Sequence, residues 1–393
     1  MKKFFYLSFF SYFIFFLLYS LFSFSLTAPN LIFSSNHYFW QFQTFMWQTF
    51  FNNRPLLATT YLSLILFLII NYLLIIFLAT KINFKIKLWH LLFLILPLIF
   101  ANNALSYDVF NYIFNAKMLW LYHANPHVKV ALDFAYDDWT RFMHNTHTPA
   151  PYGYGWTLFS VLPYALSFNK FLLAFLNFRL LSVLSLSLLF LIFTKLFKTK
   201  NNLNLLFLNP LLLIEVVSNS HNDLWMMLPA LLAFYLLTKK ITYPKLFLSL
   251  ILIIFSISIK FATLILLPIF IIFALKKNNR PIFYLLASMA LFITLLSSRS
   301  QQFHPWYLIW SLSFLPLLAK NRIAFHWRNW LIILSIASLF RYLPYLWAGE
   351  YTDLVLQQQK LITWSAVLLF AVCFFSPRIG QLIYGKKKSL LSS

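Results

Sequence analysis

The sequence predicts an all-α fold: a polytopic transmembrane helical bundle of about 12 spans with one large outer loop. Three observations carry this prediction. Hydrophobic residues make up 61% of the chain and charged residues 10%, whereas a soluble domain has about 25% charged residues. Apolar runs long enough to cross a bilayer recur along the chain, and the basic residues stand in small clusters between those runs.

The charge and cysteine content exclude several other classes. The net charge is +23, but a nucleic-acid partner is not expected, because the basic residues are not gathered on one face or tail. Membrane lipids are the expected surroundings. A single cysteine excludes an intrachain disulfide. The start, MKK followed by an apolar run without a small-residue cleavage motif, is interpreted as an uncleaved first helix.

The chain, residues 1–393, is interpreted as one integral membrane domain. Residues 1–105 hold the first three spans, 106–170 form a large extracytoplasmic loop with juxtamembrane helices, 171–376 hold the other spans, and 377–393 form a basic cytoplasmic tail. Residues 152–168 are taken as an amphipathic or re-entrant helix on the outer side. The predicted spans lie near 4–27, 57–80, 88–105, 171–194, 202–218, 223–238, 246–259, 261–275, 281–298, 305–319, 329–346 and 361–376.

Charge placement supports this topology. With the N-terminus inside, the inner segments hold 21 of the 31 basic residues and none of the eight acids. We therefore expect a plasma (inner) membrane protein with both termini cytoplasmic and its polar chemistry on the extracytoplasmic side. Because the positive-inside rule does not count acids, chance segregation of eight residues is the alternative.

The first outer loop begins with SYDVFNYIFNAKMLW, which predicts a helix over about 106–122. Asp108, Asn111, Tyr112 and Asn115 would share one face of it, at spacings of three and four. A carboxylate at this apolar boundary is expected to have its pKa raised by desolvation, which suits a general base if a substrate hydroxyl comes within hydrogen-bond reach. Helix capping is the alternative role for Asp108, since aspartate is a favoured N-cap residue.

The rest of this loop allows two arrangements of its charged residues. Asp137 and Arg141 are four apart and suit a helical ion pair. Asp137, Asp138, His144 and His147 would instead gather a metal, although their spacing matches no ligand motif, so a solvated loop is favoured and no metal is expected. The YGYGW that closes the loop holds two of the five glycines, which indicates close backbone approach or a tight turn.

Later outer turns carry further polar residues. Glu215 lies within an apolar span, where an acid marks a functional site by default, or else pairs with Arg179. It is followed by His221, Asn222 and Asp223. Lys260 and Arg299 are isolated cations suited to a lipid phosphate. His304, Trp306, Tyr307 and Trp310 follow Arg299, and for Trp306 and Trp310 an interfacial aromatic belt is the favoured interpretation.

The ordered motifs SYDVFNY, NPH, YGYGW, NPLLLIE with SHND, SIKFATLILLP and HPWYLIW resemble those of the type C glycosyltransferases, which are embedded in membranes. The resemblance runs from about 90 to 320 and is to bacterial mannosyltransferase-like members that use a polyprenyl-phosphate sugar. The chain departs from that pattern where many relatives have a proline after the first YG. It also has an extra span before the acid-bearing one.

The resemblance implies an inverting hexosyltransferase. It would move a hexose, with mannose first in order, from a polyprenyl-phosphate-linked donor to a glycan or lipid-linked acceptor, without a cofactor. Asp108 would be the general base, with Lys260 and then Arg299 on the lipid phosphate. The implied substrate-binding residues are Asn111, Tyr112, Asn125, Tyr152, Glu215, His221, Asn222, Asp223, His304, Trp306 and Tyr307.

Two other functions fit the composition. A surface-polysaccharide ligase or polymerase usually carries its largest outer loop late in the chain, and here it comes early. A flippase or transporter of lipid-linked sugars should line a central path with charges at mid-membrane depth, whereas nearly all the acids fall at the outer ends of spans.

Overall fold

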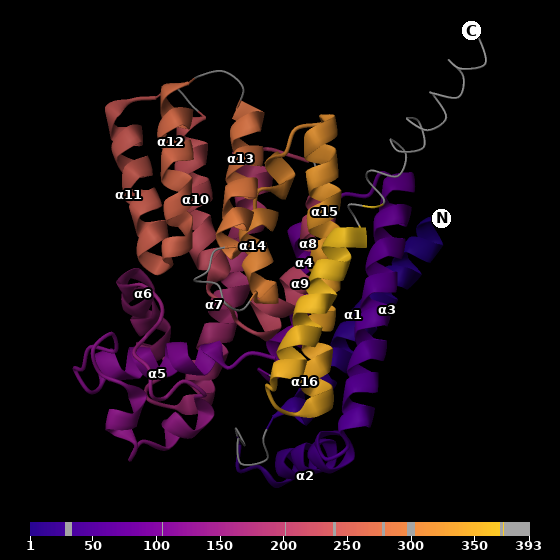
Figure 1. Ribbon diagram of the computed structural model, residues 1–393, viewed down its shortest axis with the longest axis vertical. Helices are drawn as coiled ribbons and strands as arrows, with labels where there is room; N and C mark the ends of the chain where they lie inside the picture. The colour runs from indigo at the N-terminus through magenta and orange to yellow at the C-terminus, as the bar shows by residue number, and fades with distance from the viewer. Residues whose placement is uncertain are drawn as a thin grey trace.

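The computed structural model describes residues 1–27, 34–103, 105–200, 202–238, 241–276, 280–296, 303–369 and 372. Within these residues every regular element is a helix and there is no strand. Figure 1 shows the helices standing side by side as a bundle, with a group of shorter helices crossing one end. The predicted all-α class is confirmed.

Within the described ranges, four helices are long and apolar enough to cross a membrane. They begin as α1 (Lys2–Ser23), α3 (Arg54–Lys81), α7 (Phe171–Leu191) and α15 (Arg322–Leu339), and three of them continue through further helical turns. Shorter apolar helices pack with them: α4 (Leu88–Ile99), α10 (Asp223–Leu237), α11 (Tyr243–Ile259), α12 (Leu266–Leu275) and α13 (Arg280–Ile293). The chain is a membrane protein, and the total of 12 spans stays a prediction.

Two of the predicted spans are broken helices. Residues 202–218 form α8 (Leu203–Phe207), α9 (Pro210–Leu213) and a π-helical turn, Ile214–Ser218. The break falls at Asn209, whose side chain accepts a hydrogen bond from the Leu211 amide and so starts a new helix at Pro210. Residues 305–319 likewise hold only α14 (Leu308–Leu312) between two 3₁₀ turns, Pro305–Tyr307 and Leu315–Leu317. At about 1.5 Å per residue, none of these pieces crosses a hydrocarbon core of about 30 Å alone.

The large loop contains α5 (Asp108–Trp120) and α6 (Tyr154–Ala165), joined by the 3₁₀ helices Ala131–Phe134 and Asp138–Phe142. These elements lie together at one end of the bundle (Figure 1). A helix that the sequence did not predict, α2 (His37–Met46), lies at the same end. Its start is fixed by the Asn36 side chain, which accepts hydrogen bonds from two amides of its first turn.

A buried ion pair folds this loop back on α5. Lys117 Nζ lies 2.6 Å from a carboxylate oxygen of Asp137, the Tyr122 hydroxyl donates to the same carboxylate at 2.7 Å, and Lys117 sits 3.7 Å from the centre of the Trp139 ring. The suggested pair between Asp137 and Arg141 is therefore replaced by a longer-range one. Asp137 precedes a 3₁₀ helix and caps it, so the α-helical four-residue spacing does not apply.

The YGYGW segment makes the close backbone approach that its glycines indicated. A Cβ on Gly153 would lie 1.9 Å from the Ser258 carbonyl oxygen, and one on Gly155 would lie 2.1 Å from the Ser258 hydroxyl. The Gly153 amide also donates to the Ile259 carbonyl at 3.0 Å. The start of α6 is therefore fixed directly against the end of α11, which places Tyr152 beside Lys260.

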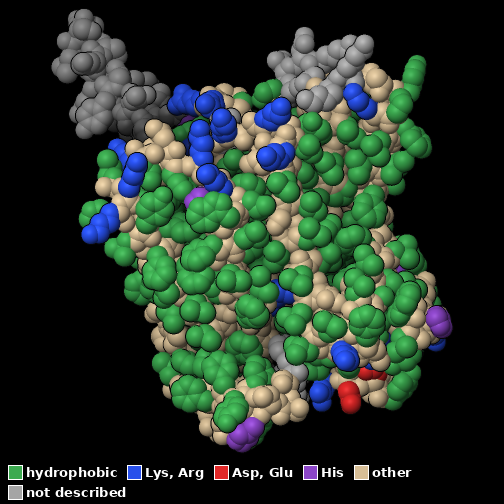
Figure 2. Space-filling view, turned by 180° about the vertical axis from the view of Figure 1, so that it is seen from behind, with side chains coloured by type: hydrophobic (Ala, Val, Ile, Leu, Met, Phe, Trp, Pro, Cys, Tyr) green, Lys and Arg blue, Asp and Glu red, His purple; other side chains and the backbone are tan. Residues whose placement is uncertain are grey.

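The two ends of the bundle differ in charge. Figure 2 shows Lys and Arg side chains gathered at one end, while the acidic side chains in this view lie at the other. The basic end holds the end of α3 and the start of α15 (Figure 1). The acidic end carries α5, and we call this end of the bundle the outer-loop end. This arrangement agrees with the segregation read from the sequence.

Candidate active site

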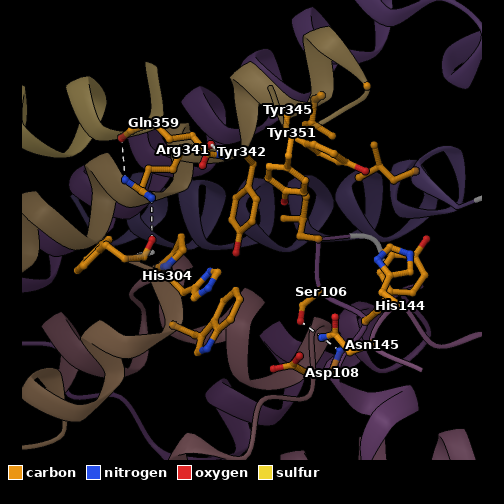
Figure 3. Close-up of a pocket in the computed structure, with 18 of the residues that line it drawn as sticks. Ser106, Asp108, His144, Asn145, His304, Arg341, Tyr342, Tyr345, Tyr351 and Gln359 are labelled. Atoms are coloured by element: carbon orange, nitrogen blue, oxygen red, sulfur yellow. Dashed lines mark hydrogen bonds between the residues drawn. The ribbon is translucent and has the colours of Figure 1, made fainter. Parts of the chain in front are cut away.

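A cavity of about 350 Å³ lies at the outer-loop end. Asp108 and Ser106 form one side of it, and Arg341, Tyr342 and Tyr345 lie across from them (Figure 3). Its other polar and aromatic lining residues are Phe51, Arg54, Tyr107, Asn111, His144, Asn145, Phe303, His304, Trp306, Tyr351 and Gln359. The cavity thus joins the outer loop to the last part of the described chain.

Asp108 occupies the first turn of α5 without capping it. The residue before the helix is Tyr107, and the helix has no side-chain cap. The Asp108 amide instead donates to the Ser106 hydroxyl at 3.3 Å. Its side chain is 21% exposed and lines the cavity. The capping alternative is therefore excluded, and the carboxylate is open to a bound molecule.

His221 lies between two carboxylates. Its Nδ1 is 3.4 Å from an Asp108 carboxylate oxygen, and its Nε2 is 3.4 Å from a Glu215 carboxylate oxygen. The ring is buried and stacks on Trp306, with ring centres 4.0 Å apart. Only the protonated imidazole carries a hydrogen on each ring nitrogen and can face a carboxylate with both. The arrangement therefore favours the protonated form of His221.

The electrostatics of the pair follow from this geometry. Burial opposes ionisation of both groups, but the close approach and positive charge of His221 lower the pKa of Asp108 to about 2. The raised pKa expected for this carboxylate from desolvation is therefore wrong, because its cationic neighbour outweighs burial. Burial likewise works against the charged imidazole, yet Asp108 and Glu215 together raise the pKa of His221 to about 9. At neutral pH Asp108 is therefore ionised and His221 is cationic.

Glu215 supports the site from outside the cavity. Its side chain is fully buried, and its carboxylate accepts hydrogen bonds from Tyr342 at 2.8 Å and Asn219 at 2.7 Å. It does not line the cavity, and its contact with the site is through His221. The alternative of a pair with Arg179 is wrong, because that guanidinium donates to the carbonyls of residues 101, 217 and 218 and to Asn103.

Two aromatic residues complete one wall. Trp306 stacks on His304 as well as on His221, with ring centres 4.4 Å apart for His304. Burial lowers the pKa of His304 to about 4, so this imidazole is neutral at the pH where His221 is charged. Trp306 is 8% exposed, which makes it a wall of the cavity rather than a member of an exposed aromatic belt.

Asp223 and Lys260 form a separate ion pair. Lys260 Nζ lies 2.9 Å from a carboxylate oxygen of Asp223, which is fully buried. The Trp310 indole also donates to that oxygen. Lys260 Nζ lies 5.5 to 5.8 Å from the ring centres of Tyr152, Tyr307 and Trp310. Because of this pair, the charge of Lys260 is already neutralised by a protein partner. Neither member of the pair lines the cavity.

Several buried polar atoms around these two pairs have no hydrogen-bond partner. They include the Asn111 side-chain carbonyl oxygen, the Tyr112 hydroxyl, both side-chain amide atoms of Asn222 and the second carboxylate oxygen of Asp223. Both ring nitrogens of His221 belong to this set too, since at 3.4 Å they face their carboxylates without a hydrogen bond. An unpaired buried polar atom costs about 1 to 3 kcal/mol. A cluster of them is expected where a polar molecule binds.

The remaining predicted residues are placed as follows. Asn125 lies beyond the far end of α5, where its side chain accepts from the His127 amide at 3.0 Å, and it is not brought to the cavity. Tyr152 packs against Tyr112, with ring centres 4.9 Å apart. Arg299 lies outside the described residues.

Arg341 was not predicted from the sequence as a site residue. This arginine follows an apolar run, where an ionisable residue marks a functional site, and that signal was available. Its guanidinium donates to the carbonyls of Phe303 and Gln359, each at 2.7 Å, and also to the Thr363 hydroxyl. Figure 3 shows it held at the cavity wall by two of these contacts. A second cation, Arg54, lines the same cavity.

The suggested metal ligands are not brought together. Asp137 is engaged by Lys117, and His144 stacks on Tyr107 with ring centres 3.7 Å apart. Within the described part of the chain, no three His, Cys, Asp or Glu residues form a group that suits a metal ion.

One cavity at the end of an apolar helical bundle is thus lined by a carboxylate and two guanidinium groups. Such groups can accept a proton and stabilise negative charge that develops on a reacting molecule. Residues 23–276 match the family model described as alpha-(1->6)-mannopyranosyltransferase, N-terminal domain. Because this match covers more than half of the 393 residues, the chain belongs to that family and is a glycosyltransferase. No curated protein and no solved structure gives a match.

Proposed function

We propose that the protein transfers a mannosyl residue from a polyprenyl-phosphate-linked donor to a glycan or lipid-linked acceptor, with inversion at the anomeric carbon. The observation that carries this proposal is the cavity that joins an ionised, partly exposed Asp108 to the guanidinium of Arg341. The family supports the sugar, since its description names a mannopyranosyltransferase.

The reaction is a single displacement. The acceptor oxygen forms a bond to the anomeric carbon while the bond from that carbon to the donor phosphate oxygen breaks. The bonding electron pair leaves with the phosphate, and the acceptor proton passes to Asp108. A positioned base contributes about 10²- to 10⁴-fold to such a step, and His221 holds the carboxylate ionised until the proton arrives.

Arg341 is better suited to the departing phosphate than Lys260, which was the first choice on sequence. Lys260 already neutralises Asp223 at 2.9 Å. Arg341 lines the cavity, and its recorded partners are neutral carbonyl and hydroxyl oxygens, so its charge is not cancelled by an acid. Arg54 adds a second positive charge at this cavity. Guanidinium groups bind phosphate oxygens through two parallel hydrogen bonds.

A side of the membrane follows from the charge distribution. Basic residues mark the cytoplasmic side of membrane proteins, and the cavity lies at the opposite end from the basic cluster of Figure 2. In this proposal the transfer occurs at the extracytoplasmic face of the plasma membrane, where lipid-linked sugars are the activated donors.

The test is an assay of membranes containing the native protein with three radiolabelled donors: a polyprenyl-phosphate mannose, the corresponding glucose lipid and a nucleotide-linked mannose. The expected result is label transfer to an extracted lipid or glycan fraction from the mannose lipid alone. Arg341→Lys, which keeps the charge but loses the two-pronged geometry, should raise KM for that donor. Transfer from the nucleotide sugar instead would overturn the proposed donor.

A further inference from the structure

Two adjoining pockets lie at the basic end of the bundle, away from the catalytic cavity. Their volumes are about 570 and 530 Å³, and they share Lys200, Asn202 and Arg328. The first is also lined by Lys320 and Arg322, and the second by Lys85. We call the pair the basic pockets.

The charge in the basic pockets is uncompensated. Five cations line them, whereas none of the chain's eight acids, all of which the structure describes, lines either one. The Arg328 guanidinium donates only to amide oxygens in its recorded contacts, to Asn329 at 2.9 Å and to Asn202 at 3.3 Å. An anion of more than one charge can therefore enter without displacing an acidic side chain.

The second pocket changes from polar to apolar along its depth. At the end of the bundle it is lined by Lys85, Lys200 and Arg328. One turn further along α15 lie Ile332 and Ile333, and one turn before Thr80 on α3 lies Ile76; these three line the same pocket. Four residues of helix advance about 6 Å. The apolar part therefore runs into the bundle, parallel to the spanning helices.

We propose that the basic pockets bind an anionic phospholipid from the leaflet at the basic end, with its phosphate on Arg328 and Lys200 and one acyl chain along α3 and α15. Basic residues that only set the membrane topology would not need to line a pocket. A free anion would occupy the basic part of the pocket alone, whereas a lipid would also place an acyl chain in the apolar part. Basic pockets between spanning helices bind anionic headgroups in this way.

The experiment measures lipid retention by native mass spectrometry of the purified full-length protein. It is titrated with phosphatidylglycerol, with phosphatidylcholine of the same acyl chains, and with inorganic phosphate. The expected result is preferential retention of phosphatidylglycerol. The Lys200→Gln, Arg328→Gln double variant should weaken that binding by about fivefold for each cation removed. The matched control, Lys3→Gln with Lys81→Gln, removes two charges at the same end outside the basic pockets and should bind as the native protein does.

A second variant separates a lipid from a free anion. Ile333 is 38% exposed, so Ile333→Ser should fold, and it should weaken phosphatidylglycerol binding while leaving phosphate binding unchanged. Three outcomes would each overturn the proposal. The two lipids could be retained equally, the Lys3 and Lys81 control could lose as much binding as the double variant, or phosphate could displace the lipid fully.

Discussion

Asp108 and Asp223 occupy the same position in two different helices but have different surroundings. Each begins its helix, α5 or α10, and each is held by a cation. Lys260 approaches Asp223 to 2.9 Å and leaves that side chain fully buried, whereas His221 stays 3.4 Å from Asp108, which remains 21% exposed in the cavity. The comparison teaches that access to a cavity, rather than pairing with a cation, distinguishes the acid that we propose as the base from the one that is enclosed by its partner.

The largest expected effect is on catalysis at Asp108. Asp108→Asn keeps the shape of the side chain but cannot take the acceptor proton, so we expect kcat per folded molecule to fall by about 10²- to 10⁴-fold. The melting temperature should fall as well, because the charge that stabilises His221 is lost. The measurement is initial rate against acceptor concentration in purified protein.

Asp138→Asn is the matched control for that variant, because Asp138 is exposed in the same loop and outside the cavity. Its rate should equal that of the native protein. If Asp108→Asn also kept the native rate, Asp108 would not be the base, and the difference drawn above between Asp108 and Asp223 would be lost.

Asp223→Asn should show the reverse pattern. Leaving Lys260 without its partner should lower the free energy of unfolding by about 3 kcal/mol, while kcat per folded molecule stays within about tenfold of native. The readout is denaturant unfolding alongside a rate normalised to folded protein. Adding Lys260→Met should restore much of the stability, since it removes the unpaired charge; no recovery would show that Asp223 acts through something other than this pair.

Tyr342→Phe tests the support beneath His221. Removing the hydroxyl that donates to Glu215 at 2.8 Å leaves a buried carboxylate with one partner fewer, at a cost of about 1.5 to 3 kcal/mol. We expect lower thermal stability together with a shifted pH profile of transfer. A purely structural hydroxyl would change the first measurement and not the second.

The last expected effect is the pH dependence of stability, which spreads over several pH units. The pKa of His221 rises from 6.5 to about 9 on folding, so its stabilising contribution is complete below pH 6.5 and is lost as the pH rises through about 9. The pKa of Asp108 falls from 3.8 to about 2, so its contribution is present above pH 3.8 and is lost toward pH 2.

The melting temperature should therefore decline between pH 6.5 and 9, and His221→Asn should flatten that decline. His304→Asn is the control, since burial lowers the pKa of His304 to about 4 and leaves it neutral throughout this range. Equal slopes in the two variants would assign the decline to other groups.

Local sequence patterns predicted the positions of the helices well, but they predicted poorly which charged residues pair with each other. The apolar runs located α3, α7 and α11 within a few residues, and the glycines of YGYGW correctly indicated close contact. Asp223 and Lys260, however, meet across 37 positions, and Lys117 replaces Arg141 as the partner of Asp137. Such pairs depend on how helices pack, which no periodicity encodes.

The residues of the cavity also show that sequence patterns do not tell which distant segments meet. Asp108, Asn111, His304 and Trp306 were all named from sequence. Arg341 was not: its place after an apolar run was a signal, but only the folded chain shows that it lines the same cavity as Asp108. The broken helix at Asn209 was equally hidden, since an apolar run gives the same hydropathy whether or not the helix is continuous.

Arg179 shows how this bundle keeps its few buried charges stable. Its guanidinium contacts carbonyls at positions 217 and 218, where the π-helical turn ends, and at position 101, just past the end of α4. Helix C-termini carry partial negative charge and N-termini partial positive charge. A cation therefore sits where two helices end, and Asp108 and Asp223 sit where two others begin, so the backbone dipoles supply part of the neutralisation that soluble proteins obtain from water.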